Sequence, residues 1–73
     1  MQVAVVVSAN AHPDTMLTTD EVAAMLRVQP RTLEDWRGDG YGPPFIYIGR
    51  HVRYRLRDVS AWIETRKASS TTG

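Results

Sequence analysis

Two short stretches of the chain carry apolar residues at helical spacing and lie close together in the sequence. The first follows a capping box, in which the Thr18 hydroxyl can accept a hydrogen bond from the Glu21 amide, and the Glu21 carboxylate one from the Thr18 amide. Leu17, just before this cap, is placed to pack against Val22 as a hydrophobic staple. The apolar side of this predicted helix consists of Val22, Ala23, Met25 and Leu26.

A second helix is predicted over residues 30–37. Pro30 has no amide hydrogen to donate, so it fits the first turn of a helix and not the interior of one. Leu33 and Trp36 then face a core, and the polar positions on the other side are Arg31, Thr32, Asp35 and Arg37. Two short helices joined in this way, the second with a polar outer face, are typical of a helix-turn-helix. For this stretch alone, a helical hairpin that merely packs is the alternative.

A β-hairpin is predicted after residues 38–44, which are rich in Gly and Pro. Residues 45–48 and 52–55 alternate as two strands around a three-residue tip at 49–51. We expect Ile48 to face Val52 across the hairpin. Ile46 then faces Tyr54, so that these four side chains share one apolar face. The opposite face would carry Phe45, Tyr47, Arg53 and Arg55.

A third helix is predicted over residues 56–67, because apolar residues again recur on one helical face. Asp58 near its start and Arg66 and Lys67 near its end each complement the helix dipole. Taken together, the three helices and the hairpin predict a core that contains Leu33, Trp36, Ile46, Ile48, Tyr54, Val59 and Trp62.

The N-terminal segment is set apart by a run of valines at residues 3–7, which favours an extended strand. A lone strand is not stable in water, so this one either pairs within the domain or adds to the sheet edge of a neighbouring molecule. A tail outside the fold is the alternative. We therefore divide the chain into an N-terminal strand or linker over residues 1–16, a folded domain over residues 17–67 and a disordered tail over residues 68–73.

Charge is unevenly distributed along the chain. Residues 1–26 contain three acidic residues and no Lys or Arg, whereas residues 27–73 contain all nine basic residues and five acidic ones. Segregation of this kind indicates a polyanionic partner for the second part. The arginines at positions 50, 53, 55 and 57 form a local cationic stripe, for which a plain solvated surface is the alternative.

Composition argues against several other function classes. The chain has no cysteine, which excludes a disulfide, a thiolate metal site and a cysteine nucleophile. Two histidines without cysteine are a weak basis for a metal site, and no catalytic constellation is present, so we expect no metal, no cofactor and no enzymatic activity. No apolar run approaches the roughly 20 residues of a membrane span, and the N-terminus lacks the basic region of a signal peptide. We therefore expect a cytoplasmic protein without a membrane partner.

The order helix, turn, helix, hairpin and closing helix predicts a winged helix-turn-helix, mostly α with a small β-hairpin and with an extra N-terminal strand at the valine run. Three stretches resemble the small phage excisionases, or recombination directionality factors, which are similar to the DNA-binding domains of MerR-type regulators. They are LRVQPRTL at residues 26–33 followed by Trp36 and Arg37, GPPF at 42–45 followed by IGR at 48–50, and VRY at 52–54 followed by DV at 58–59 and AWI at 61–63.

This resemblance covers about residues 17–67 and implies three partners: double-stranded DNA of an attachment-site region, a phage integrase and other copies of the chain, in a bacterial host cell. The sequence departs from the family at Arg27, where Gly is usual, and at Gln29, where Ser or Thr caps the helix. Arg27 is therefore expected to hold a strained backbone, at a cost of about 1 kcal/mol. The second helix is also acidic at Glu34 and Asp35, where the family tends to be basic, so affinity should depend mainly on phosphate and hairpin contacts.

The candidate DNA-contacting residues on the second helix lie at its start and one turn further on. Arg31 and Thr32 are candidates for base or phosphate contacts, and Arg37 is a candidate for a phosphate contact. Asp35 either pairs with Arg31 within the helix or accepts a hydrogen bond from a cytosine amino group. Glu34 and Arg37 have the spacing for a second intrahelical pair.

The candidates on the hairpin surround its tip. Gly49 allows close approach of the backbone, and Arg50 can enter the minor groove, where narrow A·T tracts concentrate negative potential. Arg53 is a candidate for a phosphate or groove contact. His51 and Arg55 either contact phosphate or are solvated.

One such domain covers too little DNA for tight, specific binding, because single modules bury roughly 600–1,000 Å². We expect several copies to bind adjacent sites cooperatively, with Val3, Val5 and Val7 adding as a strand to a neighbour's sheet in a head-to-tail chain that bends the duplex. The expected function is to direct a phage integrase toward excision. The alternatives are a small transcriptional repressor and, from a different class, a protein-interaction module such as an antitoxin or packaging adaptor.

Overall fold

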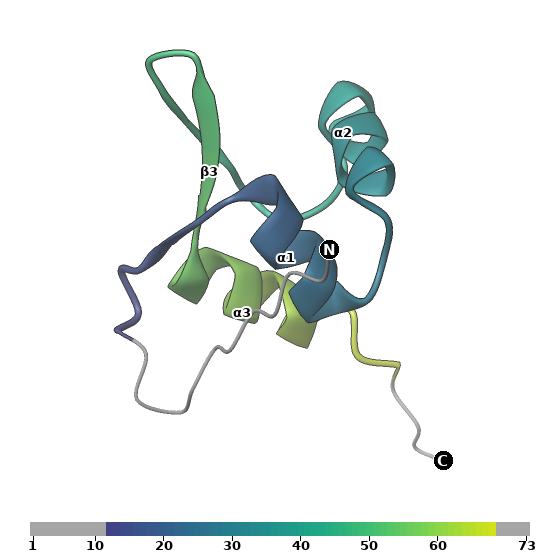
Figure 1. Cartoon of the computed structure of the whole chain (residues 1–73). Helices are drawn as coiled ribbons and strands as arrows, with labels where there is room; N and C mark the ends of the chain where they lie inside the picture. The colour runs from purple at the N-terminus through teal and green to yellow at the C-terminus, as the bar shows by residue number, and fades with distance from the viewer. Residues whose placement is uncertain (1–11, 69–73) are drawn as a thin grey trace.

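The computed structural model describes residues 12–68 and contains three helices and a small antiparallel sheet (Figure 1). The elements in chain order are β1 (Met16–Leu17), α1 (Thr19–Leu26), α2 (Pro30–Asp39), β2 (Ile46–Ile48), β3 (His51–Arg55) and α3 (Leu56–Thr65). The winged helix-turn-helix fold predicted from the sequence is therefore confirmed. We refer to the hairpin of β2 and β3, residues 46–55, as the wing.

Local hydrogen bonds define both ends of α1, and those at its end shape the turn that leads to α2. At its start the Thr18 hydroxyl accepts from the Glu21 amide at 3.1 Å, and the Thr18 amide donates to Glu21 Oε1 at 2.8 Å, which is the predicted capping box. At its end Arg27 is left-handed, with φ 60° and ψ 42°. The Val28 amide then donates to the Ala23 carbonyl at 3.0 Å. Arg27 is therefore the residue at which the chain reverses, in the strained conformation that the sequence predicted.

α2 begins at Pro30, and Gln29 before it makes no side-chain cap bond. The helix continues to Asp39, two residues beyond its predicted end, because Gly38 does not interrupt it. Gly40 ends the helix in the left-handed conformation, with φ 70°. The longer helix includes Asp39, which is exposed and is the third acidic residue of α2 after Glu34 and Asp35.

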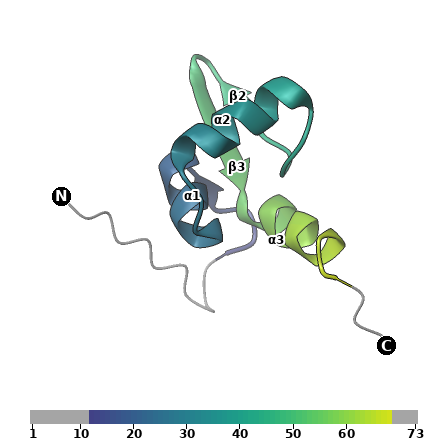
Figure 2. The same cartoon turned by 90° about the vertical axis from the view of Figure 1, so that its right-hand side faces the viewer.

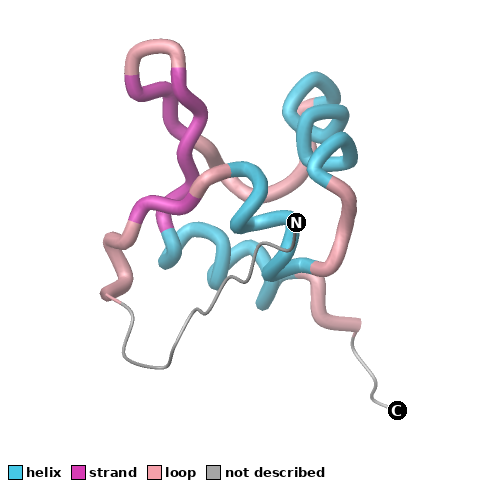
Figure 3. The backbone as a smooth tube through the Cα atoms, in the orientation of Figure 1, coloured by secondary structure: helices cyan, strands magenta, loops and turns pink. Residues whose placement is uncertain are grey.

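The sheet has the strand order β1-β3-β2, and both pairings are antiparallel (Figure 3). Met16 lies opposite Arg55, and Leu17 lies opposite Tyr54. The sheet thus has an extra N-terminal strand, but residues 16–17 form it. The predicted strand at the valine run lies outside the described residues.

The register of the wing differs from the predicted one. Tyr47 lies opposite Val52 and Ile48 opposite His51, which leaves a two-residue tip of Gly49 and Arg50. Gly49 has φ 62°, and a glycine at the first of two tip positions suits a type II′ turn, whose twist matches that of the flanking strands. The predicted three-residue tip, with Ile48 facing Val52, is therefore wrong.

A shift of one residue exchanges the two faces of β2. Phe45, which was expected on the polar face, packs against the core beside the buried Tyr54, with 6.3 Å between the ring centroids. Ile48, which was expected in the core, is 50% exposed. Ile46 is half-buried and lies opposite Arg53, whose aliphatic stem is suited to cover apolar surface.

The buried core lies where the three helices meet β1 and β3. It consists of Leu17, Val22, Ala23, Leu33, Tyr54, Leu56 and Val59. Three of the predicted core residues, Leu33, Tyr54 and Val59, are in this set. Trp36 and Trp62 are only half-buried and form an aromatic cluster with Tyr41, whose ring centroid lies 5.1 Å from that of Trp36 and 5.7 Å from that of Trp62.

The segment before β1 packs against the start of α3. The Leu56 amide donates to the Thr15 carbonyl at 2.9 Å, and the Arg57 amide donates to the Pro13 carbonyl at 2.8 Å. These amides belong to the first turn of the helix, where no residue of the helix itself can accept their hydrogen bonds. Residues 13–15 therefore cap α3 from a distant part of the sequence.

The elements are arranged so that two of them project together. The wing and α2 rise at the same end of the molecule, with α1 between them and α3 at the other end (Figure 1). Figure 2 shows the same arrangement after a quarter turn, with α3 again remote from the wing tip. The projecting end is therefore formed by the two elements that carry the predicted DNA-contacting residues.

Candidate nucleic-acid interface

The outer face of α2 is charged and exposed. Arg31 Nε donates to Asp35 Oδ1 at 3.1 Å, so the predicted intrahelical pair forms, with the two side chains 80% and 60% exposed. Thr32 is half-buried, and its amide donates to the Gln29 carbonyl at 2.9 Å. Of the residues predicted on α2, Arg31 and Asp35 are thus the two most available to a partner.

The middle and end of α2 are acidic on this face. Glu34, Asp35 and Asp39 are all exposed, and Arg31 is the one exposed cation of the helix. A phosphate backbone is repelled by such a surface and attracted to the positive, N-terminal end of a helix. The start of α2 at Arg31 is therefore the part of the helix most compatible with DNA.

The tip of the wing presents cationic side chains to open space. Arg50 and His51 are both exposed, and nothing lies within 4 Å of the position where a Cβ on Gly49 would stand. Arg53 is half-buried, and its Nη1 donates to the Val52 carbonyl at 2.8 Å, which holds the side chain along the wing. The tip can therefore approach a narrow groove without steric obstruction.

Arg37, predicted as a phosphate contact, is directed into the molecule. Its Nη1 donates to the Tyr54 hydroxyl at 2.8 Å and to the Thr19 hydroxyl at 3.2 Å. The guanidinium carbon also lies 5.7 Å from the centroid of the Phe45 ring. The intrahelical pair with Glu34 that its spacing suggested is not among the ion pairs of the described residues.

The four arginines of the cationic stripe do not form one uniform surface. Arg55 ends β3 at the base of the wing, and its guanidinium lies 3.8 Å from Asp14 Oδ1. Arg57 pairs with the same oxygen at 2.7 Å. An acidic residue from the N-terminal segment therefore neutralises part of the charge here, which separates these two arginines from Arg50 and Arg53.

Sequence reasoning identified Asp35 as the partner of Arg31, but it did not identify the partners of Arg37, Arg55 and Arg57. Asp14 and Thr19 lie far from their partners in the chain, and no local pattern connects them. Tyr54 was assigned to the core without a role for its hydroxyl. A signal was nevertheless present, because a buried tyrosine requires a hydrogen-bond partner where phenylalanine requires none.

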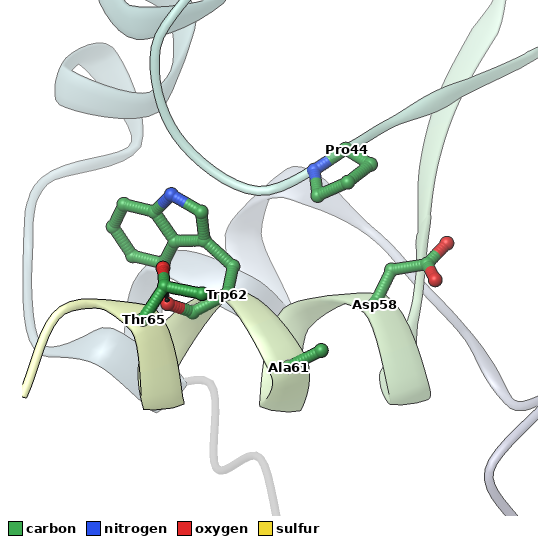
Figure 4. Close-up of a pocket in the computed structure, with 5 residues that line it drawn as sticks. All are labelled: Pro44, Asp58, Ala61, Trp62 and Thr65. Carbon is green, nitrogen blue, oxygen red and sulfur yellow. Dashed lines mark hydrogen bonds between the residues drawn. The ribbon is translucent and has the colours of Figure 1, made fainter.

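A hollow of about 270 Å³ lies between α3 and the loop before β2 (Figure 4). Its lining residues are Pro44, Asp58, Ala61, Trp62 and Thr65. Pro44 faces the helix from across the hollow, and Asp58 is the only ionisable residue in the lining. None of the predicted DNA-contacting residues lines it, and the Thr65 hydroxyl donates to the Trp62 carbonyl at 2.6 Å.

The part of the chain that the structure describes contains neither a metal-binding cluster nor a membrane-spanning helix. Within residues 12–68, no group of three or more His, Asp or Glu side chains is arranged to hold a metal ion. No helix in this range has both the length and the apolar character that crossing a membrane requires.

The fold, the arginine at the exposed start of α2 and the arginine at the wing tip are those of a winged helix-turn-helix DNA-binding domain. A family model described as a helix-turn-helix domain matches residues 16–67. The chain therefore belongs to the helix-turn-helix domain family, and the match includes all the predicted DNA-contacting residues. A comparison with curated proteins finds no match.

Proposed function

We propose that the chain is a sequence-specific DNA-binding and DNA-bending accessory protein that directs a phage integrase toward excision. The observation that carries DNA binding is that α2 and the arginine-tipped wing project from the same end of the molecule (Figure 1). A duplex at this end can receive the start of α2 in its major groove and the wing tip in a minor groove. The matched family includes excisionase-like proteins, so the proposed role in excision is compatible with the family, whereas the match itself supports DNA binding.

The proposed contacts follow the exposure of each side chain. Arg31 contacts a base or a phosphate from the start of α2, with Thr32 beside it. Asp35 either holds Arg31 or accepts a hydrogen bond from a cytosine amino group.

On the wing, Arg50 enters the minor groove, and the glycine before it allows the backbone to come close. His51 and Arg53 contact phosphates along the wing. Arg55 contributes through its charge at longer range, because Asp14 lies within ion-pair distance of it.

Cooperative binding is proposed to arise from contacts between neighbouring copies. β2 is an edge strand of the described sheet, and its residues Tyr47 and Ile48 are 68% and 50% exposed. Val3, Val5 and Val7, outside the described residues, are proposed to add as a strand to this edge in the next copy. Because the two surfaces in this contact differ, the arrangement repeats along DNA without closing.

A protein-interaction module, such as an antitoxin or packaging adaptor, is the second candidate. The acidic outer face of α2 favours it, since Glu34, Asp35 and Asp39 suit a basic protein better than a phosphate backbone. A small transcriptional repressor is the alternative among DNA-binding functions, and it would use the same surface of α2 and the wing at a single operator.

A nuclease footprint over the DNA that flanks the gene tests the proposal. We expect adjacent protected sites in helical phase, filled cooperatively, with hypersensitive cleavage where the duplex bends. A single protected palindrome at a promoter would favour the repressor. No protection at low salt would contradict both DNA-binding functions and favour the interaction module.

Deletion of residues 1–8 tests the proposed contact between copies. The shortened chain should bind a single site with unchanged affinity but fill adjacent sites independently. Deletion of residues 69–73 is the matched control, since it removes the other end of the chain and should leave cooperativity intact. Cooperative filling by the chain without residues 1–8 would contradict the role of the valines.

A further inference from the structure

Arg37 lies at the junction of α1, α2 and the wing. A single nitrogen, Nη1, donates to the hydroxyl of Thr19 at the start of α1 and to that of Tyr54 on β3. The guanidinium also lies over the ring of Phe45, directly before β2, at 5.7 Å. One side chain of α2 therefore contacts the start of α1, β3 and the residue before β2.

The acceptors of this arginine are neutral. Among residues 12–68 no carboxylate lies within ion-pair distance of Arg37, so its charge is held by two hydroxyls and an aromatic face. Tyr54 is only 1% exposed, and its hydroxyl therefore has little access to water as an alternative partner. Withdrawal of Arg37 toward a DNA phosphate would leave that hydroxyl without this bond, which is unfavourable for a buried polar group.

We infer that Arg37 is a positioning residue, which fixes the recognition helix α2 relative to the wing so that both can engage one duplex. Few direct contacts join these elements otherwise, because the core side chain of α2 is Leu33 and the outer half of the wing extends beyond the core. The bonds to Thr19 and Tyr54 set the direction of α2, and the contact with Phe45 extends the same restraint to β2. This inference rests on the proposed DNA binding and replaces the phosphate contact predicted for Arg37.

Two substitutions separate positioning from direct contact, because they remove an acceptor of Arg37 and leave every charge in place. Tyr54→Phe removes one hydroxyl and keeps the buried ring, and Thr19→Val removes the other. If Arg37 positions α2, each variant should bind a duplex that carries one protected site about tenfold more weakly. If Arg37 contacts phosphate, release of its guanidinium should leave affinity unchanged or raise it.

Tyr41→Phe is the matched control. It removes a tyrosine hydroxyl that, among residues 12–68, has only Arg66 as a hydrogen-bond partner, at 3.5 Å, in the aromatic cluster and not at the junction. Its affinity should equal that of the unaltered chain. Affinities are measured at a temperature where circular dichroism shows each variant to be fully folded, so that a loss of stability alone does not change the result.

A double-mutant cycle provides a readout that a merely structural role would not change. Arg50→Ala removes the proposed wing-tip contact, and its effect is measured in the unaltered chain and in the Tyr54→Phe background. We expect the loss of affinity caused by Arg50→Ala to be smaller in the Tyr54→Phe background, by about threefold or more. The reason is that the tip of a wing no longer aligned with α2 contributes less to binding. Equal effects in both backgrounds would overturn the inference.

The failure of the inference can be distinguished from the failure of the proposed function. Binding by the unaltered chain, with equal affinity for Tyr54→Phe and Thr19→Val, overturns only the positioning role. Absence of binding by the unaltered chain at low salt overturns the DNA-binding proposal and the inference with it.

Discussion

Arg27 shows at the scale of one residue how the chain accepts strain to make its turn. It is the only non-glycine residue with a positive φ among residues 12–68, and it ends α1 where the turn to α2 begins. A residue with a Cβ in this conformation loses about 1–2 kcal/mol relative to the right-handed one. The turn is kept because the packing of both helices on the core outweighs this local cost.

Arg27→Gly should therefore raise the free energy of unfolding. Relief of the left-handed strain is opposed by the larger entropy of glycine in the unfolded chain, about 0.5–1 kcal/mol. The expected net gain is about 0.5–1 kcal/mol, measured by urea denaturation monitored with circular dichroism.

Gly40→Ala is the matched control, because it makes the opposite change, from glycine to a residue with a Cβ, at the left-handed residue that ends α2. Gly40 has φ 70°, and nothing lies within 4 Å of an added Cβ, so backbone strain is the main effect of the substitution. A loss of about 0.5–1 kcal/mol is expected. A loss of stability in Arg27→Gly would instead show that the arginine side chain makes a stabilising contact at the turn.

At the scale of the element, the tip of the wing decides which side chains β2 contributes to the core. With a two-residue tip, Phe45 packs inward and Ile48 is half exposed. Each tip length places a different alternate set of β2 side chains on the inner face. The inner face is therefore a consequence of the turn and not of the most apolar alternation along the strands.

The register can be tested by two substitutions on the same strand segment. Phe45→Ser should lower the free energy of unfolding by about 2 kcal/mol, since it removes a ring packed against Tyr54 and the core. Ile48→Ser should change it by no more than about 0.5 kcal/mol. Urea denaturation of both variants measures the difference, and the reverse order of effects would indicate the three-residue tip.

At the scale of the whole molecule, ion pairs and internal hydrogen bonds reduce the number of cations available to DNA. Asp14 holds Arg57 and lies near Arg55, and Arg37 is bound within the junction. The principal cations left at the exposed end are Arg50 and Arg53 on the wing and Arg31 on α2, and Arg31 is itself paired with Asp35. Each copy is thus expected to make few phosphate contacts, and cooperative binding of several copies is expected to supply the affinity that one copy lacks.

The salt dependence of DNA affinity measures the number of phosphates that each copy neutralises. About three neutralised phosphates per copy correspond to a slope of about −3 in a plot of log affinity against log salt for a single site. Arg50→Gln should make the slope shallower by about 1, whereas Arg57→Gln, the control at the Asp14 pair, should leave it unchanged. A slope of about −5 would show that the arginines beside Asp14 also contact DNA.

The chain's local signals were sufficient for its elements and their order. The capping box at Thr18, the proline at the start of α2 and the apolar spacing of α3 act within a few residues, so each is readable from the sequence. The strained turn at Arg27 was expected on a different ground, because the family that the sequence resembles usually has Gly at this position. These features predicted the winged helix-turn-helix fold and the surface on which DNA binding is proposed.

Only the tertiary structure decided the wing register and the partners of Arg37, Arg55 and Arg57. The register depends on whether the tip of the wing has two residues or three. The apolar pattern along the strands favoured the three-residue tip, which is wrong. Asp14 meets Arg57, and Thr19 and Tyr54 meet Arg37, only after distant segments pack together. Whether an arginine faces a partner molecule or the protein itself is determined by such long-range contacts, which a linear pattern does not record.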